Sequence, residues 1–361
     1  MDDKLANLFR AKMAQSCDNA LLLSQSTAYK TVLGCKIGVN IIALTTLLWG
    51  YYKTVRTQKF SALHKNVQRA LHLHVYYIGH VIVFIGITNS IDFARLNVVH
   101  EQRCEYLLPF WLTFVIRQGY MFGVMGQTLT FVFLSLERIM ATFRKDYAHK
   151  TSKTVFVIST AIILTFCFCY TYIYMGYDAQ WDDMTEFFTQ ANEFNAHRIS
   201  SFIYYIVSFE GFSLLFYNLT YLLNSREKNK INIHEKRVTQ ITKSLAEKYQ
   251  IDENRKVARL MLPVCWFHFI LYTASYGGFI IFVNAIWNQS QIEVYMCVNE
   301  MLGFITFYPY IFIYRILSYF VRKQKTLVVQ GKETTADYFN QMNELFRSNP
   351  KVQSKDKSKR R

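Results

Sequence analysis

The chain has 361 residues, of which 52% are apolar and 17% aromatic, and its formal net charge is +16. In a soluble protein, a charge of this size would indicate nucleic acid as a partner. Here the apolar residues form seven long stretches, and most basic residues lie between alternate stretches. The basic residues are therefore expected to set the membrane topology and to contact anionic lipid headgroups. This interpretation favours an integral membrane protein and argues against nucleic-acid binding.

Each apolar stretch is long enough to cross a hydrocarbon core of about 30 Å as a helix. They predict an all-α membrane protein with a seven-transmembrane helix bundle over 29–319, between an N-terminal segment (1–28) and a basic tail (320–361). The expected spans are approximately 31–52, 67–91, 109–136, 154–177, 199–223, 257–283 and 294–319. The first residues lack the apolar core of a cleavable signal peptide, so we expect the first span to direct insertion.

The distribution of charge between the loops predicts the orientation. Of the 41 Lys and Arg residues, 31 lie in the tail and in the loops after the first, third and fifth spans, whereas seven lie on the opposite side. The basic segments are 53–66 with Arg69, 138–153, 224–259 and 320–361. Because basic loops remain in the cytoplasm, we expect the N-terminus outside and the C-terminus cytoplasmic.

Seven cysteines occur, without a CxxC pair or a Cys/His metal-ligand spacing. Cys17 and Cys104 lie in segments that we place outside, where disulfides persist. The second outer loop (178–198) contains no cysteine, so a bridge from the third span to this loop cannot form. We predict a disulfide between Cys17 and Cys104, with two free thiols as the alternative.

Three ionisable residues, Arg117, Glu210 and Glu300, lie inside apolar spans, and Lys36 lies nearer an outer end. Each costs ~2.5–3.5 kcal/mol at the centre of a membrane helix, so each should face the interior and have a partner. Arg117 and Glu300 lie at similar depth, ~10 Å from the outer ends at helical rise, and Glu210 lies a turn deeper. We therefore pair Arg117 with Glu300 first and Glu210 second. These residues either line a ligand cavity in the outer half of the bundle or fix helix register.

The dipeptide Glu137-Arg138 lies where the third span meets the cytoplasm. An arginine at this position is always charged and offers five donors. It is suited to lock the resting bundle through a carboxylate and then to contact a docked partner. The alternative is an interfacial base that follows the positive-inside rule beside an unrelated acid.

Four histidines, His72, His74, His80 and His268, raise the question of a membrane zinc hydrolase. His72 and His80 lie near one helix face, but His74 points elsewhere. No HExxH motif occurs, and no aspartate lies inside an expected span. We therefore expect packed or hydrogen-bonded histidines, no metal, no cofactor and no enzymatic activity. His268 remains a further candidate for the ligand cavity.

Two outer loops carry further candidates. The loop 178–198 has five acidic residues against one base, Arg198, and is either an acidic lid over a cavity mouth or a solvated loop. Asn288 begins an outward-facing Asn-x-Ser triplet and is a glycosylation candidate, although the shortness of its loop argues against its use.

Four segments resemble signatures of a known family. They are the cysteine-led stretch Cys17–Ser24; Leu63-His64-Lys65-Asn66, with leucine for the usual phenylalanine; Glu137–Thr142, followed by Tyr147; and Tyr249–Asn254, followed by Pro263, with Lys248 for the usual arginine. In order and spacing they resemble the nematode serpentine chemoreceptors of the Sra superfamily, of the Srab or the Sra class. The resemblance covers most of residues 17–320.

The resemblance implies a seven-helix bundle of the G-protein-coupled receptor type in the plasma membrane of sensory neurons, in particular their cilia. Such a receptor detects a small environmental chemical and activates a heterotrimeric G protein; the resemblance leaves the oligomeric state open. The inner switch would comprise Glu137, Arg138, Tyr249, Gln250, Glu253 and Asn254. The seventh span departs from the wider receptor class, because the stretch 308–312 lacks both the Asn and the Tyr of an NPxxY motif.

Two other functions remain open at this point. A seven-span ligand-gated channel of the insect odorant-receptor kind has its N-terminus inside, which the charge distribution argues against. A membrane metal-dependent hydrolase would require a ligand constellation that the sequence lacks.

Overall fold

The computed structural model describes residues 3–56, 64–143, 153–189, 195–237, 245–286, 292–301 and 304–318. The chain divides into two compact units, Met1–Ile313 and Tyr314–Arg361. The described part of the second unit, 314–318, is helical.

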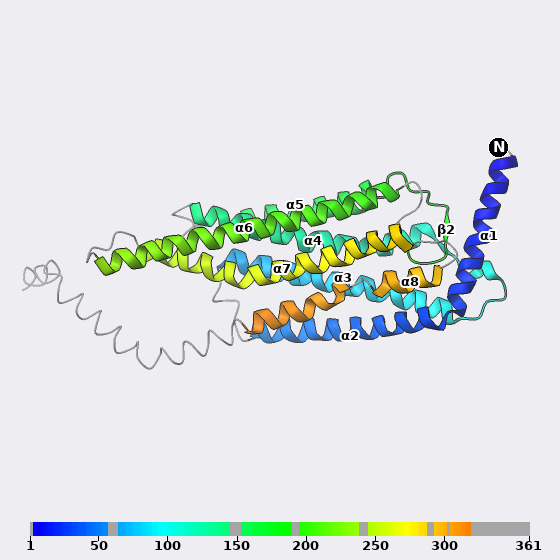
Figure 1. Cartoon of the computed structure of the whole chain (residues 1–361), viewed down its shortest axis with the longest axis horizontal. Coiled ribbons are helices and arrows are strands. Elements are labelled where there is room, and N and C mark those ends of the chain that lie inside the picture. Colours follow the sequence, from blue (N-terminus) through cyan, green and yellow to red (C-terminus); the bar gives the residue numbers. More distant parts are fainter. Residues whose placement is uncertain are drawn as a thin grey trace, which may run out of the picture. The chain divides into compact units, whose positions relative to one another are not determined.

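The described part of the first unit is built almost entirely of helices (Figure 1). They are α1 (Asp3–Gln25), α2 (Thr27–Arg56), α3 (Lys65–Asn97), η2 (Arg103–Tyr106), α4 (Phe110–Phe143), α5 (Lys153–Phe168), the π-helix η4 (Cys169–Tyr174), α6 (Ala196–Arg237), α7 (Leu245–Ile286), α8 (Ile292–Met301) and η6 (Phe304–Phe307). Two short strands, β1 (Leu108–Pro109) and β2 (Met184–Thr185), pair in antiparallel fashion.

Six described helices are long and apolar enough to cross a membrane, and they overlap the first six predicted spans. Their bounds are Thr27–Arg56, Lys65–Asn97, Phe110–Phe143, Phe156–Tyr174, Ser201–Lys230 and Gln250–Gly278. The described parts of the seventh predicted stretch are helical: they are α8, η6 and the segment 308–318. The predicted all-α membrane fold is confirmed.

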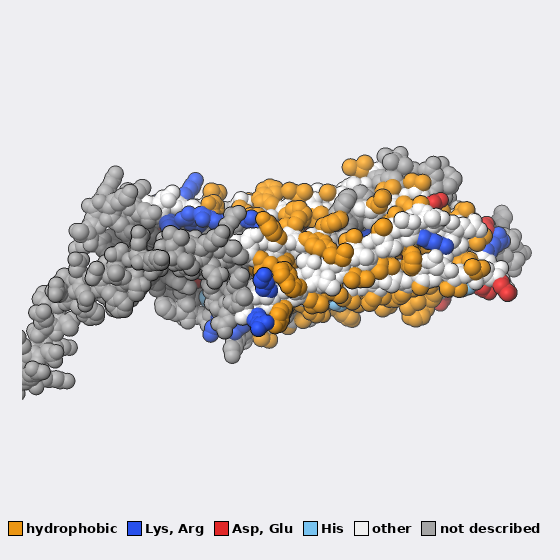
Figure 2. All heavy atoms as spheres, turned by 90° about the horizontal axis from the view of Figure 1, so that it is seen from below, with side chains coloured by type: hydrophobic (Ala, Val, Ile, Leu, Met, Phe, Trp, Pro, Cys, Tyr) orange, Lys and Arg blue, Asp and Glu red, His pale blue; other side chains and the backbone are white. Residues whose placement is uncertain are grey.

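On the face that Figure 2 shows, apolar side chains are spread along the sides of the bundle, as lipid contact requires. In α2, for example, Ile41, Ile42 and Leu48 are each more than half exposed. A membrane protein can expose such residues because lipid tails are as apolar as the side chains themselves.

The helix α4 lies at the centre of the bundle and packs against α3, α6 and α7. Of its most apolar window, 72% is buried, the largest share among the six candidate spans. Glycines let α3 approach closely: a Cβ atom would lie 2.2 Å from Phe84 at Gly119 and 2.3 Å from Tyr77 at Gly126. Small residues at such contacts allow membrane helices to pack backbone to backbone.

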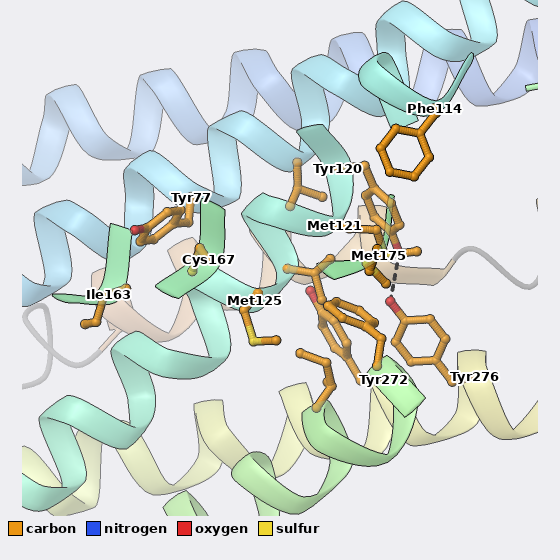
Figure 3. Close-up of a cluster of buried hydrophobic side chains, with 14 of the residues drawn as sticks. Tyr77, Phe114, Tyr120, Met121, Met125, Ile163, Cys167, Met175, Tyr272 and Tyr276 are labelled. Atoms are coloured by element: carbon orange, nitrogen blue, oxygen red, sulfur yellow. Dashed lines mark hydrogen bonds between the residues drawn. The ribbon is translucent and has the colours of Figure 1, made fainter. Parts of the chain in front are cut away.

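One core cluster lies between α3, α4, α5, α6 and α7 and includes Met175 and Ala179, which follow η4 (Figure 3). Tyr120 and Met121 from α4 lie beside Tyr272 and Tyr276 from α7 in this cluster, and a dashed line joins the hydroxyls of Tyr120 and Tyr276. The two helices therefore contact each other through closely packed side chains.

The N-terminal helix α1 lies outside the six candidate spans, and the sequence predicted no secondary structure for this segment. Its residues Cys17, Ala20 and Leu23 are completely buried in a second cluster with residues of α3, η2 and α8. The following helix begins after Ser26, whose Oγ accepts a hydrogen bond from the Tyr29 amide at 3.0 Å, as an N-cap does.

Candidate functional site

The first cluster of candidate residues surrounds Arg138 near the end of α4, and we call this end of the bundle the Arg138 end. Arg138 is only 1% exposed. Its Nε and Nη2 donate to the two carboxylate oxygens of Glu137 at 2.6 and 2.5 Å. Its Nη1 donates to Oδ1 of Asn254 in α7 at 3.0 Å. The buried charge is therefore compensated by the neighbouring acid and tied to a second helix.

Three predicted residues of α7 contact the cluster around Arg138. Asn254 also donates to Oγ1 of Thr142 in α4 at 3.3 Å. Gln250 donates through Nε2 to the carbonyl oxygen of Ala141. Glu253 accepts a hydrogen bond from the backbone amide of His64, just before α3, at 2.8 Å. The structure thus brings five of the six predicted switch residues together; the side chain of the sixth, Tyr249, lies outside the described residues.

His64 occupies the N-cap position of α3, beside the same cluster. Its Nδ1 lies 3.9 Å from Oε1 of Glu137. Burial lowers the pKa of His64, the charge of Arg138 lowers it further, and the carboxylates of Glu137 and Glu253 oppose this shift. His64 is therefore neutral in this conformation at pH 7. In the sequence, the only indication of a role for His64 was its position in the motif segment 63–66.

The second cluster lies at the opposite end of the bundle, which we call the disulfide end because Cys17 and Cys104 form a disulfide there. Glu300 of α8 is 4% exposed and accepts a hydrogen bond from Nζ of Lys36 in α2. Arg117 of α4 lies farther away, with Nη2 3.8 Å from Oε1 of Glu300. The predicted first pair is within ion-pair distance, but Lys36 is the closer partner.

Glu210 does not pair with Arg117, the second partner that the sequence suggested. Instead Oε1 of Glu210 in α6 lies 2.9 Å from Nδ1 of His268 in α7, without the alignment of a hydrogen bond. The sequence predicted the wrong partner because it gives depth along each helix but not the rotation of the helix about its axis.

A polar network that the sequence did not predict lies between the two ends of the bundle. Gln127 of α4 accepts from the Tyr272 hydroxyl at 3.4 Å, and its Oε1 lies 3.2 Å from Nε2 of His268. Next to it, Nε2 of His74 in α3 lies 2.7 Å from the hydroxyl of Tyr308. Tyr308 therefore contacts α3 at the position where the wider receptor class carries its NPxxY motif.

Asp92 is another residue that the sequence missed, because α3 continues six residues beyond the expected end of its span. It is 4% exposed, and its Oδ1 accepts from Nη2 of Arg95 at 2.6 Å. Arg95 also donates to the backbone oxygens of Tyr106 and Glu186. This pair therefore fastens η2 and the β2 segment to the end of α3.

The loop 178–198 partly covers the disulfide end. Its strand β2 pairs with β1, and the amide of Phe110 donates to the Asp183 oxygen at 2.8 Å. Arg198 donates to Asp178 and lies 5.1 Å from the ring centroid of Tyr177. Arg198, the one basic residue of this loop, is therefore paired with Asp178 of the same loop.

The remaining candidates concern metal binding and glycosylation. Within the described ranges, no group of three or more His, Cys, Asp or Glu side chains is arranged to hold a metal ion. His72 contacts the Tyr51 hydroxyl at 3.1 Å. The glycosylation candidate Asn288 lies outside the described residues.

Comparison with known proteins identifies the family. The family model of the serpentine type 7TM GPCR receptor class ab chemoreceptors matches residues 14–347, which is most of the chain and includes both clusters. No curated protein matches the chain. The predicted resemblance is confirmed, and the match selects class ab from the two classes considered. The chain therefore belongs to the class ab family of serpentine seven-transmembrane chemoreceptors, a family of multi-pass membrane receptors and not of enzymes.

Proposed function

We propose that the protein is a chemosensory receptor in the plasma membrane of the sensory cilium. It binds a small chemical at its disulfide end and activates a heterotrimeric G protein at its Arg138 end. The N-terminus is outside and the C-terminus cytoplasmic. The charge distribution supports this orientation, and family membership supports the receptor role.

The observation that carries the proposal is the hydrogen bonding of Arg138. It joins α4 to α7 through Asn254, and Gln250 makes a second bond between the same two helices. Breaking these bonds frees the inner end of α7 to move outward. A G-protein helix that enters the space can then accept the arginine's donors at its terminal carbonyls.

A path between the two ends runs along α7 itself. This helix carries Tyr276 near the disulfide end, His268 in the central polar network and Asn254 at the Arg138 end. A ligand that contacts Tyr276 therefore acts on the same helix that the Arg138 cluster restrains. Activation requires only that the ligand bind the open conformation more tightly than the closed one.

The basic residues of α6 and α7 around the Arg138 end favour an acidic partner surface. They include Arg226, Lys228, Lys230, Arg255, Lys256 and Arg259. Complementary charge of this kind accelerates association and fixes the orientation of docking.

The proposal is tested by two substitutions at one contact, in cells that express the receptor with a promiscuous G protein. Arg138→Ala is expected to abolish ligand-driven signalling at unchanged surface level. Asn254→Ala is expected to raise basal signalling several-fold, because it removes the bond to α7 but leaves the Arg138–Glu137 pair. Asn97→Ala, at an exposed asparagine of the opposite end, is the matched control.

Undiminished signalling by Arg138→Ala would contradict the switch role. The orientation is tested separately: an N-terminal epitope should be accessible to antibody on intact cells. Access only after permeabilisation would instead favour the topology of the insect odorant-receptor channels.

A further inference from the structure

We propose that the ligand of this receptor is a small organic anion, a carboxylate with an apolar body, and that Arg117 is its primary contact. The inference rests on the proposed receptor function and adds the chemical class of the ligand. It is carried by an excess of positive charge in a buried site at the disulfide end.

The charges at this site do not balance. Lys36 and Arg117 share a single carboxylate, that of Glu300, and Lys36 makes the closer contact. The nearby acid Asp92 is neutralised by its own partner Arg95 at 2.6 Å. Glu293 lies on an exposed position of α8 and accepts from Ser26 at 2.5 Å. Among the residues that the structure describes at this site, one positive charge is left over, and it belongs to Arg117.

The guanidinium of Arg117 also has donors to offer. Among the residues that the structure describes, its polar contacts are limited to the 3.8 Å approach to Glu300. The guanidinium also lies near the ring of Tyr120, whose centroid is 5.9 Å away. A planar fork with several unused N–H groups is suited to bind a carboxylate through two parallel hydrogen bonds.

The position of Arg117 on its helix shows where these donors point. Phe114, three residues before it, and Met121, four residues after it, are both buried in the bundle, so Arg117 lies on the same inward face. Its side chain is nevertheless 21% exposed, and that of Lys36, on the inward face of α2, is 14% exposed. Both cations are therefore partly accessible although they lie on inward faces, so a ligand or water can reach them.

The surroundings suit an acid with an apolar body. The hydroxyls of Tyr120 and Tyr276 lie 3.3 Å apart and face each other across the gap between α4 and α7 (Figure 3). The Tyr29 hydroxyl is buried, within electrostatic range of Glu300 and Arg117, and has no hydrogen-bond partner in the described part of the chain. Such a hydroxyl can donate to a carboxylate oxygen.

The experiment compares compounds that differ only in charge. Hexanoate, octanoate and benzoate are tested against their primary amides, methyl esters and amines, both in the G-protein assay and by thermal stabilisation of the purified receptor. We expect at least one carboxylate to give a signal and a shift in melting temperature that its neutral and cationic analogues do not give. The melting assay needs no G protein, so it separates ligand recognition from coupling.

Substitutions then assign the contact to Arg117. Arg117→Gln is expected to weaken the response to the carboxylate by about 10- to 100-fold, the usual effect of losing a charge-assisted hydrogen bond. Arg117→Lys is expected to restore part of the response, because it returns the charge without the planar fork. Arg103→Gln, at an exposed arginine of the same end, is the matched control and should leave the response unchanged.

The outcomes separate the two proposals. If only amides, esters or amines act, the anion assignment is wrong and the receptor function stands. If a carboxylate shifts the melting temperature but gives no signal, the anion assignment stands and the coupling is refuted. If no compound of any charge acts in either assay, the anion assignment is refuted for these acids. An unchanged carboxylate response in Arg117→Gln would also overturn it.

Discussion

Arg138 is almost fully buried although it carries a permanent charge. Removing such a charge from water is expensive unless a close partner and further hydrogen bonds compensate it. Glu137 supplies two of these bonds and Asn254 the third. Because Glu137 is in the same helix and Asn254 is not, the contact can open on one side without leaving the charge unpaired. This asymmetry makes the pair suitable for a switch rather than for permanent cross-linking.

We expect His64 to make the stability of the Arg138 end depend on pH. Burial and the charge of Arg138 depress the pKa of His64 in the closed conformation, so closure excludes a proton that the released side chain would bind. The closed conformation therefore has its full stability, with respect to protonation of His64, above the ordinary pKa of histidine, about 6.5. It loses stability as the pH falls through and below that value, because the released side chain then binds a proton that the closed conformation excludes. We expect the melting temperature of the purified receptor to drop between pH 7.5 and 5.5.

The contribution of His64 is measured by comparison with His64→Gln, which should show a smaller drop over the same interval. Because other histidines also titrate, the difference between the two proteins is the relevant quantity. His100→Gln, at a partly exposed histidine of the opposite end, is the control. If the melting temperature falls equally in His64→Gln and in the unsubstituted receptor, His64 does not contribute to the pH dependence.

The contact between α3 and α4 organises the bundle at the scale of whole elements. Gly119, Gly123 and Gly126 of α4 recur at helical spacing, and at each of them a Cβ atom would come within 2.6 Å of an α3 side chain. The two helices can therefore approach more closely than larger residues would allow. The helix α4 also carries Arg117, Gln127 and Arg138. Its close packing against α3 therefore helps to position these three residues.

Substitution of Gly126 tests this role. Gly126→Ala would place a Cβ atom 2.3 Å from the Tyr77 ring, and we expect it to cost about 1–3 kcal/mol of stability through overpacking. Gly211→Ala in α6 is the matched control, because nothing lies within 4 Å of its Cβ position and alanine favours a helix. Thermal unfolding in detergent measures both, and equal stability of the two variants would contradict a close α3–α4 contact.

At the scale of the whole first unit, the disulfide end is held together by a covalent bond and a small core. The Cys17–Cys104 bridge closes a loop of 87 residues and joins α1 to η2. Removing such a bridge costs about 2–4 kcal/mol. We expect Cys17→Ser and Cys104→Ser to lower the melting temperature to the same degree, and the double variant to lower it no further.

Peptide mapping under non-reducing conditions checks the bridge directly. Cys35→Ser is the control, because Cys35 is an exposed free thiol. If both cysteines are recovered as free thiols, or if the two losses add in the double variant, the bridge does not form.

The sequence by itself determined the helical membrane fold and the approximate positions of the first six spans, and the family resemblance indicated five residues that the structure brings together at the Arg138 end. It could do so because hydrophobic length and loop charge are local properties, and because the motif segments lie at fixed places relative to the spans. Only the tertiary structure decided which polar residues meet. Lys36 rather than Arg117 is the closer partner of Glu300, and His268 lies against Glu210. Those pairings depend on the rotation and packing of helices far apart in the chain, which no local pattern encodes.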